Sequence, residues 1–318
     1  MLKENAAESA RSRQGARILL LALFLVVSLS PTGTVVSQRR SSAPQSSSLV
    51  ITTQPEAIVW IDEIRRGVTD ATGRLELKKV TGGRHTVRVR ATGFNEVSVP
   101  LLPGRRSLAV KLVRTTDQAQ LTFQQAELAR EAARDDESRL KAAELYRDAL
   151  KIRPAYSAAR VGLARVLLDL NQYREALAEI DAARRSRPVY PEASAVEGRI
   201  NGEAAFTDEA IQSFRRSIRE AKGFQPEAHV GLARILEEKG QYVEAEAEFR
   251  KALAQLADSE PVIYQLLGAS LEKQQKFKEA VVAYEKYLEL APNGGLAPAV
   301  RSIIEQLRRD ADGLEIIP

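Results

Sequence analysis

The pattern of hydrophobic and polar positions changes twice along the chain. An apolar run, ILLLALFLVV, covers residues 18–27, and a polar stretch rich in Ser and Gln follows it. From Leu49 short runs alternate apolar with polar residues, as in HTVRVRA, where Val87 and Val89 face one way and the arginines between them the other. This period of two predicts strands. From Thr116 the period becomes 3.6, which predicts helices to near the end of the chain.

The helical part repeats itself at intervals of 34 or 35 residues. A small residue is followed four positions later by a bulky one and three later by another small one, first at Ala142, Tyr146 and Ala149. The bulky residue recurs at Ile180, Phe214, Phe249 and Tyr284. The five units span residues 123–156, 157–190, 191–225, 226–260 and 261–294, and residues 296–310 form a predicted capping helix. Such units bury their apolar faces only by stacking on one another, so residues 118–310 are predicted to form one all-α superhelix.

A helix-turn-helix unit of this length and residue pattern resembles the tetratricopeptide repeat (TPR). The resemblance implies an array in which the first helix of each unit lines a concave surface that binds a protein partner.

Residues 49–114 are predicted to form a small antiparallel β domain. Their motifs include Pro55-Glu56, a strand through Val59 and Ile61 to Asp62, GRHTV at 83–87, Gly93-Phe94 and Gly104. These residues resemble the PEGA domain, a β-sandwich found on extracytoplasmic proteins, which implies no catalytic residues. The chain departs from that family at Ala57 and Glu63, where glycines are expected. The predicted fold class is therefore multidomain, a β-sandwich followed by the TPR superhelix.

The N-terminal segment has the layout of an export signal. Arg11, Arg13 and Arg17 precede the apolar run, which is shorter than the roughly 20 residues of a membrane-spanning helix. Residues 1–37 are predicted to be a cleaved signal or an uncleaved anchor running through Val36, and residues 38–48 a polar linker. The protein is expected in the periplasm, or anchored to the inner membrane and facing outward, with membrane contact through this segment alone.

The composition disfavours several classes of function. The chain has no cysteine and two histidines, so it is poorly supplied for a metal site or a catalytic triad. It contains no phosphate-binding loop, and we expect no enzyme activity, no catalytic or metal-binding residues and no cofactor. The sequence pI is 9.4, but residues 115–318 carry 29 basic and 34 acidic side chains, so we expect no nucleic-acid partner.

Three arginines share the ninth position of the first helix in units two to four. The six residues of this predicted binding surface are Arg165, Arg199 and Arg234, with Val161, Ala195 and Val230 at the fifth positions. Equal positions lie on one helix face. One hypothesis is that the arginines bind an acidic or carboxylate-bearing segment of a partner. The alternative is that they are solvated and pair with Glu192, Glu227 or Glu237.

Trp60 leaves a second possibility open. If Val59 and Ile61 face the core of the β domain, alternation makes Trp60 partly exposed, and its ring could stack on a sugar or a partner. Alternatively, Trp60 covers a domain junction or an edge. The sequence thus favours an envelope scaffold that binds a protein through the TPR groove. The alternative is a binder of envelope polysaccharide or peptidoglycan acting through the β domain, with the array as a spacer.

Overall fold

The computed structural model describes residues 47–62, 64–80, 84–222, 224–256 and 260–314, all of which belong to one compact unit. The predicted export signal or anchor at 1–37, most of the predicted linker, Glu63 and Gly83 lie outside the described residues. Among the described residues, no helix is both long enough and apolar enough to cross a membrane.

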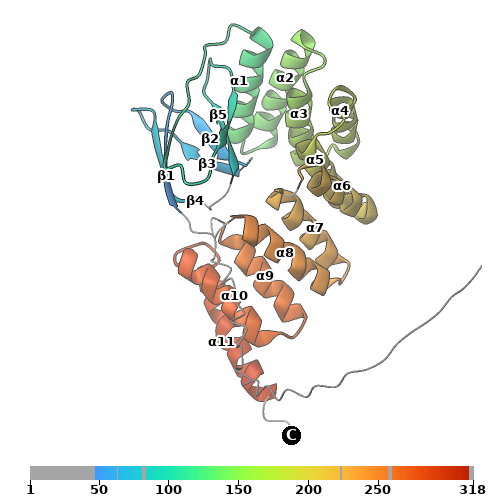
Figure 1. Ribbon diagram of the computed structural model, residues 1–318. Coiled ribbons are helices and arrows are strands. Elements are labelled where there is room, and N and C mark those ends of the chain that lie inside the picture. Colours follow the sequence, from blue (N-terminus) through green and yellow to red (C-terminus); the bar gives the residue numbers. More distant parts are fainter. Residues whose placement is uncertain (1–46, 63, 81–83, 223, 257–259, 315–318) are drawn as a thin grey trace, which may run out of the picture. The chain divides into compact units, whose positions relative to one another are not determined.

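The β region consists of two small sheets (Figure 1). One has the order β4-β1-β7 and is formed by β1 (Ser47–Thr52), β4 (Arg74–Val80) and β7 (Ser107–Ala109). The other has the order β3-β2-β5-β6 and is formed by β2 (Ile58–Ile61), β3 (Ile64–Val68), β5 (His85–Arg90) and β6 (Val97–Leu101). The expected antiparallel pairing holds for every pair but one, because β1 and β7 run parallel.

The alternation of the strands places one set of side chains in a shared core. Val87 and Val89 on β5 are fully buried, and they join Val59 on β2 and Leu49 and Ile51 on β1 in one apolar cluster. Both sheets therefore contribute to a single core, which is the arrangement that their period of two predicts.

The helical region contains five antiparallel pairs and a last helix (Figure 1). The pairs are α1 (Gln118–Ala132) with α2 (Asp136–Ile152), α3 (Ser157–Asp169) with α4 (Tyr173–Ser186), α5 (Pro191–Glu203) with α6 (Thr207–Glu220), α7 (Pro226–Glu238) with α8 (Tyr242–Leu256), and α9 (Val262–Lys273) with α10 (Phe277–Leu290). The last helix is α11 (Ala297–Leu314), which extends four residues beyond the predicted capping helix. The prediction of an all-helical repeat array is confirmed.

Local signals in the sequence fix several helix ends. Asp117 caps α1, where its side chain accepts a hydrogen bond from the backbone N–H of Gln120. Asp135 caps α2 in a capping box with Ser138. Pro191 and Pro226 begin α5 and α7, a position where the missing N–H of proline leaves no hydrogen bond unmade.

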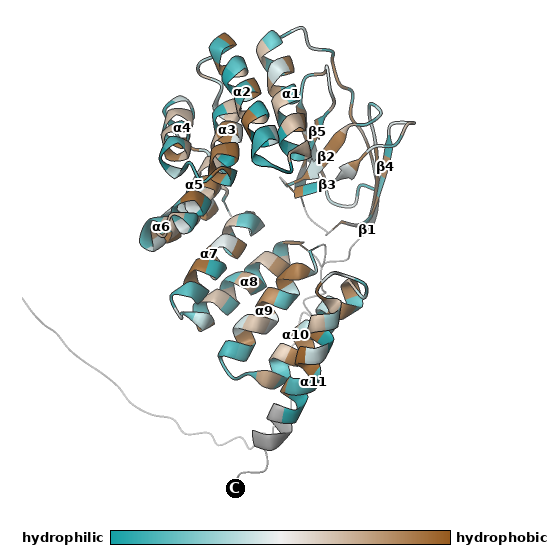
Figure 2. Cartoon of the chain, turned by 180° about the vertical axis from the view of Figure 1, so that it is seen from behind, coloured by the Kyte–Doolittle hydropathy of each residue, from teal (hydrophilic) through white to brown (hydrophobic). Residues whose placement is uncertain are grey.

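The bulky residue of each repeat fills the space between helices. Tyr146, Phe214 and Tyr284 are at most 1% exposed, and each lies against a glycine on a first helix. A Cβ added to Gly162 would lie 2.3 Å from the ring of Tyr146, and one added to Gly231 2.4 Å from the ring of Phe214. Figure 2 shows that the helices carry both hydrophobic and hydrophilic residues, as packing on one face requires.

We predict that Gly162→Ala destabilises the array, because the new methyl group overlaps a buried ring rather than the flexible end of a side chain. The expected loss is about 1–3 kcal/mol in the free energy of unfolding, measured by urea denaturation. Gly295→Ala is the control, since nothing lies within 4 Å of its Cβ position. Equal stability of the two variants would contradict the packing described for Tyr146.

Candidate binding site

The three arginines predicted to form a binding surface differ in their partners. Arg165 pairs with Glu192 at 2.7 Å between Nη1 and Oε1, and Arg199 with Glu227 at 3.8 Å between the same atoms. Arg165 is 21% exposed and Arg199 is 45% exposed, whereas Arg234 makes no ion pair within the described ranges and is exposed. The alternative of local pairing thus describes the first two arginines, while Arg234 keeps its charge toward solvent.

The charges around Arg165 compensate one another. Burial alone lowers the pKa of the Arg165 guanidinium, but the carboxylates of Glu192 and Glu227 more than offset this, so the pKa is raised. Burial likewise raises the pKa of Glu192, and the nearby guanidiniums of Arg165 and Arg88 reverse that effect and lower it. Arg165 is therefore held by carboxylates of its own chain, and a partner's carboxylate would have to displace them.

The small apolar neighbours of the arginines lie deeper than predicted. Val161 is 1% exposed and Ala195 is fully buried, so the prediction that these two residues belong to the binding surface is wrong. Val161 belongs to the core cluster of α1–α5, because the fifth position of the first helix faces the neighbouring helices. Val230 is half-buried and packs against the core of the later repeats.

One face of α1 contacts the β region, a contact that sequence reasoning did not predict. The side chain of Gln124 accepts a hydrogen bond from the N–H of Gly93 at 2.9 Å and donates one to the carbonyl of Phe94 at 2.8 Å. One turn before Gln124, Gln120 donates to the same carbonyl at 3.4 Å, and two turns after it Glu131 pairs with Arg65 at 2.9 Å. Gln120, Gln124, Glu127 and Glu131 recur every three or four residues, which places them on one face of α1. This spacing was the signal in the sequence from which the contact face could have been found.

Glu127 lies on the same face of α1 and makes two of its ion pairs. Its carboxylate pairs with Arg90 of β5 at 3.2 Å and with Arg130 at 3.4 Å, and it accepts a hydrogen bond from the hydroxyl of Tyr146. Burial raises the pKa of Glu127, but the two guanidiniums and the hydroxyl outweigh it and lower the pKa to about 2. The carboxylate is therefore ionised over the physiological range and joins β5 to both helices of the first pair.

Trp60 is buried at this junction. Its side chain is 8% exposed, and the guanidinium carbons of Arg88 and Arg90 lie 4.2 and 5.2 Å from the ring centroid. Arg88 stands directly opposite Trp60 in the register of β2 and β5, so the two side chains share a face of the sheet. Trp60 is therefore not partly exposed, and the alternative that it covers a domain junction describes its place. Stacking on a sugar stays a prediction that this burial disfavours.

A cavity of about 620 Å³ lies between the β region and the first helices of the array. Its lining includes Trp60, Glu127, Arg165, Glu192 and Glu227, so predicted site residues from both parts of the chain meet there. Basic and acidic groups alternate around it and largely neutralise each other. Such a lining joins two parts of a protein more readily than it selects a charged ligand.

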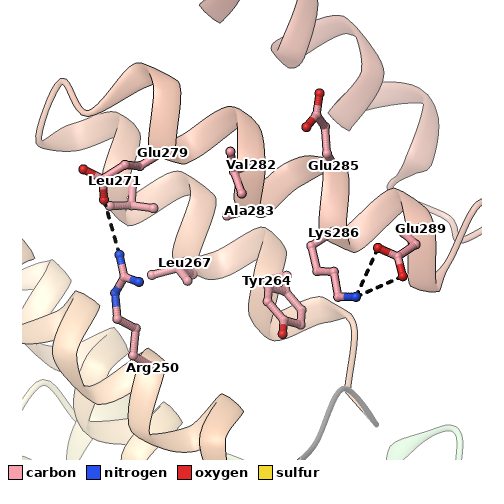
Figure 3. A pocket seen from close by; sticks show the side chains of 10 residues that line it. All are labelled: Arg250, Tyr264, Leu267, Leu271, Glu279, Val282, Ala283, Glu285, Lys286 and Glu289. Atoms are coloured by element: carbon pink, nitrogen blue, oxygen red, sulfur yellow. Dashed lines mark hydrogen bonds and ion pairs between the residues drawn. The ribbon is translucent and has the colours of Figure 1, made fainter. Parts of the chain in front are cut away.

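A second cavity, of about 510 Å³, is formed by α8, α9 and α10 (Figure 3). Leu267, Leu271 and Ala283 form its apolar part, and the pairs Arg250–Glu279 at 3.3 Å and Lys286–Glu289 at 2.9 Å stand at its rim. The rim charges satisfy each other, and none of the predicted site residues lines this cavity.

Comparison with known proteins identifies the repeats. Models of the tetratricopeptide repeat match residues 133–200 and 224–293, so the chain contains TPR repeats, as the repeat pattern predicted. Neither model describes an enzyme family. No curated protein matches the chain.

Solved structures resemble the fold at low sequence identity. The crystal structure of PilW, a widely conserved type IV pilus biogenesis factor, is 16% identical, with a TM-score of 0.52 over 63% of this chain and 94% of its own. MamA from Desulfovibrio magneticus RS-1 is 17% identical, with a TM-score of 0.47 over 56% of this chain and 98% of its own. A thermophilic TPR protein of Thermus thermophilus is 20% identical, with a TM-score of 0.48 over 59% of this chain and 98% of its own.

We predict that Glu127→Gln removes a pH-dependent part of the stability. The folded-state pKa is depressed from 4.5 to about 2, so the stabilisation is present above pH 4.5 and is lost as the pH falls from 4.5 toward 2. The variant should lose about 3 kcal/mol at pH 7 and show a flatter stability curve in that window, measured by denaturation at several pH values.

Glu137→Gln is the matched control, since Glu137 is 81% exposed and pairs with Lys141 only on the surface. It should change the free energy of unfolding by less than about 0.5 kcal/mol. A Glu127 variant that behaves like this control would show that the junction is not held by the carboxylate.

Proposed function

We propose that this protein is a non-enzymatic scaffold, exported to the cell envelope, that binds a protein partner through its TPR array. The observation that carries the proposal is the array itself, because stacked repeats present an extended surface on their first helices and such surfaces bind proteins. Arg199 and Arg234 are the exposed members of the arginine row and supply charge for recognising an acidic segment.

The β region supports an orienting role in this proposal. Its two sheets share one core, in keeping with the PEGA-like sandwich that we propose, and it contacts α1 through Gln124 and Glu127. At another place Ile64 packs against the core of the later repeats, and Arg66 interacts electrostatically with Glu260. The β region therefore contacts both the first and the later repeats. The side chains of Arg199 and Arg234 stay exposed to solvent.

No specific observation favours the alternative of a polysaccharide binder. The aromatic side chain on which that alternative depends is Trp60, and its ring is covered by Arg88 and Arg90.

We predict that Arg199→Ala combined with Arg234→Ala weakens capture of the partner at least tenfold. Two desolvated carboxylate contacts contribute on the order of 1–3 kcal/mol each. The measurement is quantitative cross-linking and pull-down from an envelope extract with the full chain, followed by affinity measurement with the captured protein.

The control variant combines Arg185→Ala with Arg215→Ala, which removes the same charge from exposed positions on the second helices α4 and α6. It should retain the affinity of the unaltered chain. Equal weakening in both variants would show a general charge effect, and unchanged affinity in both would exclude the arginine row as the binding surface.

We predict that the apolar run directs export. Replacing Leu21 and Leu23 by Arg should hold the full chain in the cytoplasm, because charges in the apolar core of a signal oppose its insertion, whereas Ile at both positions should leave export intact. Cell fractionation with the intact N-terminal mass decides between cleavage and anchoring. An unaltered chain found in the cytoplasm with its complete N-terminus would end this part of the proposal.

A further inference from the structure

Two ion pairs of the array follow one rule of position. Each joins the ninth residue of one repeat to the second residue of the next, as Arg165 with Glu192 and Arg199 with Glu227. Both glutamates directly follow the proline that begins the next first helix. Because stacked repeats present equal positions at equal places, the same geometry recurs along the array.

The third place in this series has the arginine but not the glutamate. Arg234 is the ninth residue of the fourth repeat, and the proline of the next repeat, Pro261, is followed by Val262. Arg234 is exposed and makes no ion pair to any residue that the structure describes, and Val262 is 44% exposed. By the positional rule, Val262 stands where the two earlier arginines have a glutamate, so an exposed apolar side chain takes the place of the carboxylate.

The nearest groups on α7 leave Arg234 accessible. Glu237 lies one turn further along the helix and interacts electrostatically with Arg234, but its side chain hydrogen bonds with Ser270 of α9 and is half-buried. Val230 lies one turn before Arg234, half-buried against the core of the later repeats. Apolar surface thus lies on the flanks of the arginine, and a bound chain could use both.

We propose that Arg234 binds a carboxylate of the protein partner, at the place that Glu192 and Glu227 occupy within the chain for the two preceding arginines, with an apolar side chain of the partner resting on Val262. The proposal rests on the proposed protein-binding function and narrows it to one position. The segment recognised is an Asp or Glu next to a Leu, Ile or Val. A guanidinium suits this task because its planar donors match both oxygens of a carboxylate.

The experiment uses the full chain and a synthetic peptide of alternating Glu and Leu, blocked at both ends, with a twin in which Gln replaces every Glu. Binding is followed by NMR of the arginine side-chain N–H groups, and the Arg234 signal is assigned from its absence in Arg234→Ala. The Glu peptide should shift this signal and bind at least tenfold more tightly than its twin, and raised salt should weaken it.

Val262→Glu provides the sharpest test, because it places the missing carboxylate within the chain. It should weaken binding of the Glu peptide at least tenfold, while Val262→Gln, the control of equal size, should stay within about threefold of the unaltered chain. Arg199→Ala should weaken binding of the Glu peptide less than Val262→Glu does, because Arg199 already pairs with Glu227. Equal binding of the two peptides, no shift at millimolar peptide, or full binding by Val262→Glu would overturn the proposal.

A second readout needs no peptide. If the positional rule holds, Val262→Glu raises the melting temperature by about 1–2 °C in the unaltered background and not in Arg234→Ala. Absence of this coupling would overturn the assigned geometry. Capture of a protein partner that survives Arg234→Ala would leave the scaffold function standing while this inference falls, whereas failure of the unaltered chain to capture any partner would remove the scaffold function itself.

Discussion

An aromatic ring placed against a residue without a side chain is the contact on which the array depends. Tyr146 of the first repeat lies against Gly162 of the second, and Phe214 lies against Gly198 of its own repeat and Gly231 of the next. Each ring fills a space that opens only because the facing helix has no Cβ there, so neighbouring helices approach closely and bury the ring completely. Stacking of repeats then follows, since the rings of Tyr146 and Phe214 are covered by a glycine of the next repeat.

The charged side chains of the array fall into two groups, those paired within the chain and those left exposed to solvent. At the first repeats, Glu127, Arg130 and Arg165 are held by partners in the same chain, and the pair of Glu127 with Arg90 joins the β region to α1. Buried pairs of this kind contribute through complementarity, since removal of one member leaves the other desolvated and uncompensated. Further along, Arg234 has no such partner among the described residues, and its charge is left for another molecule.

The sequence predicted the periodic parts of the fold well and the contacts between them poorly. The bulky residues of the repeats, such as Tyr146 and Phe214, are buried as the repeat pattern predicted, because each unit packs by the same rule. Val161 was assigned to the wrong environment, because the groups that cover it come from neighbouring helices. For Trp60 the sequence left exposure and a domain junction open, because the arginines that cover its ring come from a neighbouring strand. A row of polar side chains on one helix face looks the same in the sequence whether the face contacts water or another domain. The contact of Gln120 and Gln124 with the carbonyl of Phe94 could therefore not be predicted.

The parallel pairing of β1 with β7 constrains the order in which the chain can fold. β1 is the central strand of its sheet, yet its partner β7 begins 60 positions later at Ser107. Contacts of such long sequence separation form slowly, because a large loop must close before they are made. During synthesis the β region must therefore wait until β7 has emerged, whereas each helix pair that follows joins residues near in sequence and can be added to the array as it appears. The β region precedes the helices along the chain, but its sheet of β4, β1 and β7 is complete only once Ala109, nine residues before α1, has been made.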